Sequence, residues 1–151
     1  MVTDSRVLAE GYGPGAWHGP DLKAALNGVT PELAFWRPAT GRHNIAEIAL
    51  HHAFCTRAVR AQLSGVAAEA FVLAGDDWFA LPDEHALPWT TVEQTVAAEH
   101  ERLTRVVGEI EAGRATSPIA EAERTNLSLG IACHAIYHAG QIQLIKRLKE
   151  G

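Results

Sequence analysis

The stretch NIAEIALHHAFCTRAVRAQLSG, from Asn44 to Gly65, constrains the fold most, because it predicts about six turns of helix without a breaker. It opens with a cap residue, has Glu47 three positions later as in a capping box, and closes on a glycine. Core-type residues recur along it every three or four positions: Ile45, Ile48, His52, Cys55, Val59 and Leu63. We therefore expect a long helix that packs one face into a core.

Three further helices are predicted by the same kinds of signal, and no alternating strand pattern is present. Their expected ranges are 21–28 with Asp21 as the N-cap, 90 or 91 to 113, and about 126–149. Residues 30–44 and 66–89 are predicted connections, and residues 1–20 an irregular arm because glycine and proline are frequent there. The predicted fold is an all-α four-helix bundle in one domain spanning residues 1–151.

The charge pattern argues against several kinds of partner. The net charge is −5 and lysine and arginine are scattered, so we expect no nucleic-acid partner. The chain has no run of about 18 apolar residues and no signal-peptide pattern, so we expect no membrane contact and a cytoplasmic location. Cys55 and Cys133 lack the spacing of a disulfide or CxxC motif and are expected to be buried, reduced thiols.

Two histidines lie one turn apart in the last predicted helix. At 100° per residue, His138 lies about 40° from His134, on the stripe that also carries Ile131 and Ile145. Two buried imidazoles need partners for every ring nitrogen, and a divalent metal ion would supply one. The spacing alone does not separate metal ligands from two independently satisfied core histidines.

A third ligand is available in the long helix, at His51 or His52. Three nitrogen ligands would leave a coordination position for water or substrate, as in a catalytic metal site. Periodicity favours His52, which lies nearer the centre of the apolar face. His51 has Glu47 one turn before it, and its carboxylate is a candidate for holding a metal ligand in place, for a general base, or simply for capping the helix.

The other histidines are expected to be solvated, with His18, His43 and His85 in loops and His100 on an exposed helix face. Trp78 and Tyr137 are candidate substrate-binding residues. The catalytic residues are otherwise not defined by the sequence.

The motifs HNIAEIALHHAF, GDDWFALP and GIACHAIYHAGQIQLIK together resemble the DinB-like (YfiT-like) metalloprotein superfamily, over most of the chain from about Asp21 to Lys149. The resemblance implies a four-helix bundle of up-down-down-up topology, often dimeric, that holds zinc or nickel on three histidines. Carried over by position, these are His51, His134 and His138, in place of the His52 that periodicity favours. Gln141 matches the family's GQI glutamine, with a supporting role near the metal.

Characterised members of that superfamily resemble thiol S-transferases that use low-molecular-weight thiols. For this chain the resemblance implies a metal-dependent transferase in which a metal-bound thiolate attacks a small electrophile. Two alternatives stay open: a metal-dependent hydrolase with a metal-bound water, and a non-catalytic metal-binding stress protein. Whether the chain is an enzyme is not decided by its sequence.

Overall fold

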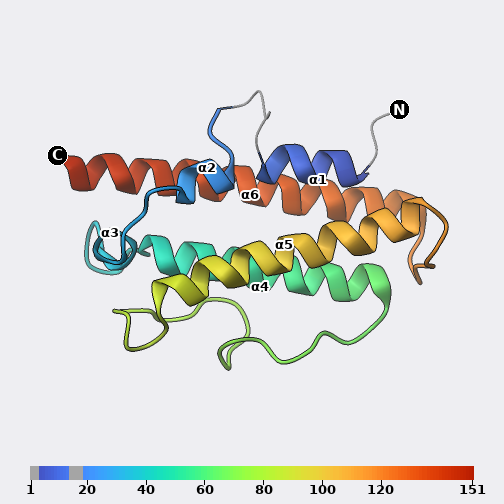
Figure 1. The fold of residues 1–151 in the computed structure, drawn as a ribbon, viewed down its shortest axis with the longest axis horizontal. Coiled ribbons are helices and arrows are strands. Elements are labelled where there is room, and N and C mark those ends of the chain that lie inside the picture. The colour runs from blue at the N-terminus through green and yellow to red at the C-terminus, as the bar shows by residue number, and fades with distance from the viewer. Residues whose placement is uncertain (1–3, 14–18) are drawn as a thin grey trace.

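The computed structural model describes residues 4–13 and 19–151, and this part of the chain forms six α-helices and no strand (Figure 1). The helices are α1 (Asp4–Tyr12), α2 (Leu22–Leu26), α3 (Pro31–Phe35), α4 (Ile45–Ser64), α5 (Trp89–Glu111) and α6 (Glu121–Glu150). The predicted all-α class is confirmed. None of the described helices is long and apolar enough to cross a membrane.

The three long helices, α4, α5 and α6, form the body of the molecule. Figure 1 shows α4 and α5 running in the same direction and α6 running back against both. The short helices α1 and α2 follow one another along α6, and α1 also contacts α5. Together they occupy the place of a fourth helix, and α4 packs against both α5 and α6.

The capping signals that predicted α4 are present in the structure. The Asn44 side chain accepts a hydrogen bond from the Glu47 N–H at 2.9 Å, and the Glu47 carboxylate accepts one from the Asn44 N–H at 3.3 Å. At the other end Gly65 has a φ of +69°, the left-handed conformation that ends many helices. These two ends fix the register of α4, and therefore the positions of its histidines.

The prediction of an irregular arm over residues 1–20 is wrong for Asp4–Tyr12, which forms α1. The glycines that suggested an arm begin only at Gly11, so the preceding turns are free of breakers. Leu8 is buried in a core cluster with Leu63 and Leu103, which stabilises α1 on the bundle. Residues 14–18, which include His18, lie outside the described residues.

Two other boundaries differ from the prediction. The connection before α4 contains a helix, α3, in which Thr30 is the N-cap and Pro31 the first residue, where its missing N–H costs nothing. The last helix begins at Glu121 rather than near Asn126, with no side-chain cap to mark its start. The sequence therefore predicts the start of a helix best where a side chain caps that end, as in α4, and less well where no side chain does, as in α6.

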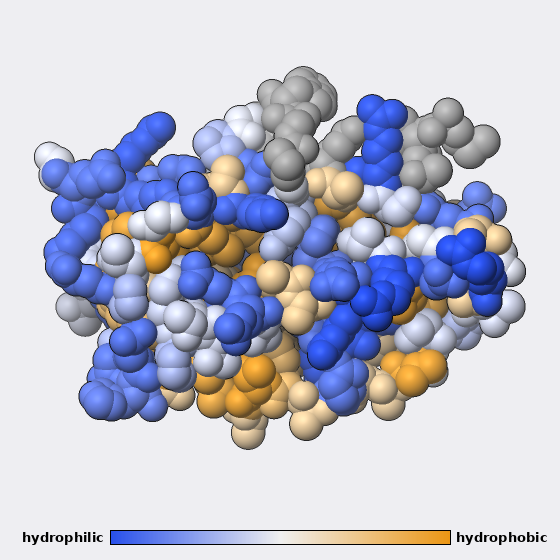
Figure 2. Space-filling model, viewed as in Figure 1, coloured by the Kyte–Doolittle hydropathy of each residue, from blue (hydrophilic) through white to orange (hydrophobic). Residues whose placement is uncertain are grey.

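The loop 65–88 returns the chain to the start of α5 and is fastened to the bundle by two kinds of contact. The Phe71 ring lies 5.4 Å from both the Phe54 and Phe79 rings. The Glu69 carboxylate accepts hydrogen bonds at 2.7 Å from both Arg60 and Arg102. Figure 2 shows a largely polar face with an apolar patch at its lower edge, where this loop runs in Figure 1. The loop is thus held in a fixed position beside α4.

Candidate metal centre

Three histidines from two helices meet between α4 and α6. The Nε2 atom of His134 lies 3.2 Å from Nε2 of His51 and 3.1 Å from Nε2 of His138. His138 and His51 are buried and His134 is half-buried. We call these residues the histidine triad, and their spacing means that they could hold a metal ion.

The spacing of the triad fits a transition-metal cation. Nitrogen ligands at about 2.0–2.1 Å in tetrahedral geometry are separated from each other by about 3.3–3.4 Å, close to the two distances observed. Three ring nitrogens directed at one point carry lone pairs that repel one another unless a proton or a cation lies between them. A divalent cation satisfies all three together, so the donor set is suited to one.

The outer nitrogens of two triad members are held by acceptors. His51 Nδ1 lies 2.9 Å from the Asp77 carboxylate and 3.2 Å from the Asp77 carbonyl oxygen. His138 Nδ1 lies 2.6 Å from the Gln141 amide oxygen. Because acceptors face both Nδ1 atoms, we infer that each carries the proton, which leaves the Nε2 lone pairs directed at the centre.

His52 supports the third triad member from behind. Its Nδ1 lies 2.8 Å from His134 Nδ1, and its Nε2 lies 3.4 Å from the Thr56 hydroxyl. Burial, followed by the neighbouring histidines, lowers the pKa of His52 well below its usual value, so its ring is neutral and can accept the His134 proton. The structure thus places His51 in the triad and His52 beside His134, although periodicity favoured His52 as the ligand.

Two members of the triad, His134 and His138, have pKa values below the usual value for histidine. Burial lowers the pKa of His134 to about 4, and the nearby His138 and His51 lower it further than the Asp77 charge raises it. Burial also lowers the pKa of His138, and the hydrogen bond that His138 donates to the Gln141 amide oxygen partly opposes this by raising it. Neutral imidazole is the form that binds metal ions, so protons should compete little with a metal ion for His134 and His138 at neutral pH.

Glu47 is held by a set of donors rather than placed as a base in the site. Its carboxylate accepts from both terminal nitrogens of Arg37 at 2.7 and 2.9 Å, from the Leu81 N–H at 3.1 Å and from the Asn44 N–H, and it lies 3.1 Å from His43 Nδ1. Burial would raise the pKa of Glu47, but these hydrogen bonds together lower it. We therefore do not propose it as the catalytic base.

Aromatic rings flank the triad. The half-exposed Trp78 indole stacks between the rings of His51 and His43, with centroid distances of 3.9 and 3.7 Å. His43, expected to be a solvated loop residue, is thereby part of the surroundings of the site. Tyr137 lies edge-on to His138 at 5.3 Å and is largely exposed. The two candidate substrate-binding residues, Trp78 and Tyr137, thus lie next to the triad, and their contact with substrate stays a prediction.

His100 also differs from expectation, because it is partly buried rather than on an exposed face. Its ring stacks on Tyr12 at 3.6 Å, and burial lowers its pKa to about 4, with a further contribution from Lys23. No described triad contact involves it.

Sequence reasoning missed two residues at the site. Asp77 comes from the loop 65–88, which has no periodicity to place it. Cys55, expected only to pack in the core, lies one turn after His51 with its Sγ 3.8 Å from His51 Nε2, and burial raises the pKa of its thiol to about 11. His51, Cys55 and Asp77 form a second group whose ligand atoms lie close enough to hold an ion.

Cys133, expected to be buried, is exposed, and both thiols are free.

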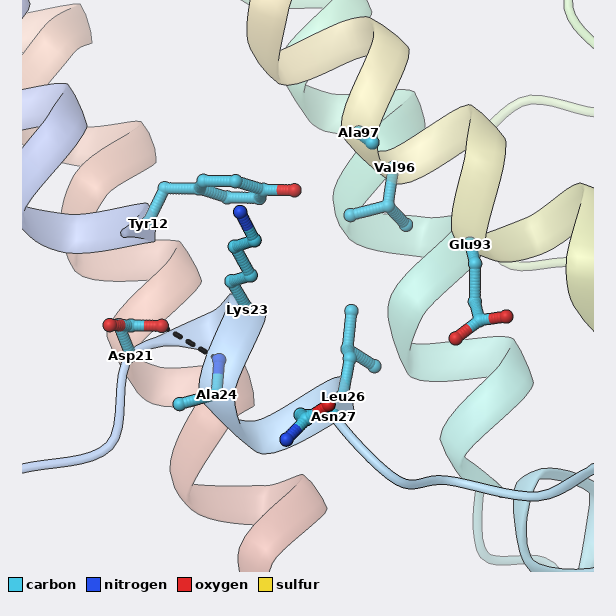
Figure 3. A pocket seen from close by; sticks show the side chains of 9 residues that line it. All are labelled: Tyr12, Asp21, Lys23, Ala24, Leu26, Asn27, Glu93, Val96 and Ala97. Atoms are coloured by element: carbon cyan, nitrogen blue, oxygen red, sulfur yellow. Dashed lines mark hydrogen bonds between the residues drawn. The ribbon is translucent and has the colours of Figure 1, made fainter. Parts of the chain in front are cut away.

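Two cavities lie in different parts of the bundle. A groove of about 320 Å³ between α4 and α6 includes Cys55 and His134 in its walls. A larger cavity of about 430 Å³ lies between α2 and α5 beside Tyr12, with Lys23 and Glu93 at its sides (Figure 3). No residue of the triad lines the larger cavity, whereas the groove includes His134 and adjoins the candidate metal centre.

A family model for the DinB superfamily matches residues 16–142. The chain belongs to the DinB superfamily. The match includes the whole histidine triad, and members of this superfamily commonly bind metal ions. Searches of the curated proteins and of the solved structures gave no match to this DinB-superfamily chain.

Proposed function

We propose that this DinB-superfamily protein is a metal-dependent thiol S-transferase that acts on small electrophiles, with His51, His134 and His138 as its metal ligands. The observation that carries the proposal is the convergence of three Nε2 atoms: that of His134 lies 3.2 Å from that of His51 and 3.1 Å from that of His138. Three protein ligands leave room for a small molecule in the coordination sphere, as is typical of catalytic sites. Zinc or nickel is expected, because imidazole ligands suit both.

Such a cation, when bound, would lower the pKa of an incoming thiol or water. The residues of the chain have separate tasks. Asp77 and Gln141 hold the ring orientations of His51 and His138, and His52 holds that of His134. The Trp78 indole covers His51 and limits access of water on that side.

The proposed reaction transfers the electrophilic group to a low-molecular-weight thiol. A bond forms between the thiol sulfur and the electrophilic carbon, and the bond from that carbon to the leaving group breaks. The leaving group departs with the electron pair of that bond, and the thiol proton passes to solvent. The largely exposed Tyr137 ring beside His138, on a different triad member from the one that Trp78 covers, supports access of small molecules to the triad from the Tyr137 side.

The test is to follow the loss of a small alkyl or aryl halide in the presence of metal-loaded protein, with and without a thiol. We expect consumption only when metal and thiol are both present, and none with His138→Ala. His85→Ala, which changes an exposed loop histidine, is the matched control and should keep full activity. Consumption without thiol would overturn transfer in favour of metal-dependent hydrolysis. A metal-loaded protein that consumes no electrophile would favour a non-catalytic metal-binding protein.

The homodimer and the cytoplasmic location implied at the sequence level stay predictions. The outward face of α6 is the surface on which we expect a second chain to pack, because it exposes several large apolar side chains. These are Leu129, Tyr137, Leu144 and Leu148. Size-exclusion chromatography with light scattering measures the mass of the particle and decides whether it is twice 16.3 kDa.

A further inference from the structure

The groove between α4 and α6, which we call the α4–α6 groove, is lined mainly by apolar groups. Its walls include Cys55 and Val59 from α4 and Leu127, Gly130, Ile131 and His134 from α6. The lining residues include no charged aspartate, glutamate, lysine or arginine. A volume of about 320 Å³ is at the small end of the range for small-molecule sites.

The groove leads directly to the triad. His134 belongs to both, and the Cys55 thiol in its wall lies only 3.8 Å from the His51 Nε2 atom. The groove follows α6 from Asn126 to His134, a separation of eight residue steps that corresponds to about 12 Å along the helix. One end of the groove is therefore at the proposed reaction centre, and the groove continues from there along an apolar stretch of α6.

We propose that the α4–α6 groove is the subsite for an uncharged, apolar substituent of the substrate, such as a linear alkyl chain, with the reactive end of that substrate at the triad. This inference rests on the proposed function for the position of the reactive end. The binding of the apolar chain rests on the groove itself. A charged substituent would lose its hydration there without gaining a partner, so the groove selects against it.

Gly130 allows the groove to be narrowed without disturbing the fold. A Cβ atom built at this position meets no atom within 4 Å, so a larger side chain can be added into open space. Gly140 has equally open surroundings, lies on the same helix and does not line the groove. Replacing glycine within a helix by leucine favours the helix, so both variants should fold.

The probes are primary alcohols from 1-butanol to 1-octanol, titrated into the purified full chain while the amide NMR signals are followed. We expect the signals of residues 127–131 and of Cys55 and Val59 to shift. The dissociation constant should fall about two- to fourfold for each added methylene until the groove is filled. Gly130→Leu should weaken 1-hexanol binding at least about tenfold and Gly130→Ala by less, whereas Gly140→Leu should bind as the unmodified chain does.

The alcohols contain no electrophile and require no metal ion, so the result does not depend on the proposed reaction. An affinity that is independent of chain length would overturn the proposal. So would shifts confined to the cavity beside Tyr12, or a Gly130→Leu variant that binds 1-hexanol as well as Gly140→Leu does. Alcohol binding in the groove without any transferase activity would keep the subsite and overturn the reaction.

Discussion

Two polar clusters lie one turn apart on α4, and they differ in how their polar groups are satisfied. In the Glu47 cluster a buried carboxylate is surrounded by donors from Arg37, His43 and the backbone. In the histidine triad three ring nitrogens face one another while their outer nitrogens are already bonded. The Trp78 ring separates the two clusters, stacked on His43 and on His51.

This difference distinguishes a structural cluster from a candidate ligand site. Buried polar groups are normally paired within the protein, and the Glu47 cluster follows that rule. The triad has its acceptors aligned on a common point, which a cation would satisfy. Two clusters of similar composition and position can therefore have different purposes, and the orientation of donors and acceptors separates them.

The largest expected effect is on metal binding by His138→Ala. Loss of an outer hydrogen-bond partner commonly weakens a metal site about 10- to 100-fold, and removal of a ligand should weaken it further. Elemental analysis after dialysis should show near one metal ion per chain in the unmodified protein and little in the variant. His85→Ala is the control. An unchanged metal content in His138→Ala would remove the triad from the account.

The next largest effect is on the free energy of unfolding, and it is expected when the Glu47 cluster is changed. Glu47→Gln leaves Arg37 without its buried charge partner and should lower the free energy of unfolding by about 2–4 kcal/mol, measured in urea. The folded variant should bind metal as tightly as the unmodified chain. Glu101→Gln breaks an exposed pair with Arg105 and should cost less than about 0.5 kcal/mol. Loss of metal with unchanged stability in Glu47→Gln would contradict the separation of the two clusters.

A smaller effect is expected when a supporting residue of the triad is changed. Gln141→Leu keeps the size of the side chain and removes the acceptor from His138 Nδ1, so metal affinity should fall about tenfold or somewhat more. Gln143→Leu, two residues further along the same helix, is the control. Competition with a chelator of known affinity measures both variants, and equal affinities would mean that Gln141 does not orient the ring.

The last contrast is between the triad and His100, a partly buried histidine away from it. Its pKa is about 4 in the folded chain and near 6.5 when unfolded, so unfolding takes up a proton between these values. Stability should therefore fall as the pH is lowered from about 6.5 to about 4. His100→Phe keeps a ring on Tyr12, and its stability should fall less over this range, with one proton fewer taken up on unfolding. Identical pH profiles in urea would show that His100 does not contribute.

The elements predicted best are those with local signals at both ends. α4 has a capping box and a terminal glycine, and its range follows from them. The α1 helix was missed because its stability depends on Leu8 packing into a distant cluster, which no local pattern shows. The three histidines could be named from spacing and family resemblance together, whereas the choice between His51 and His52 depends on how α4 is rotated against α6. Asp77 is contributed by a loop whose path is set by tertiary contacts.

The most direct test of the metal centre is a crystal structure of the purified protein with anomalous diffraction recorded at the zinc and nickel absorption edges. We predict a single strong peak about 2.0–2.1 Å from the Nε2 atoms of His51, His134 and His138. A peak bonded instead to Cys55 and Asp77, or no peak in protein incubated with either ion, would contradict the account.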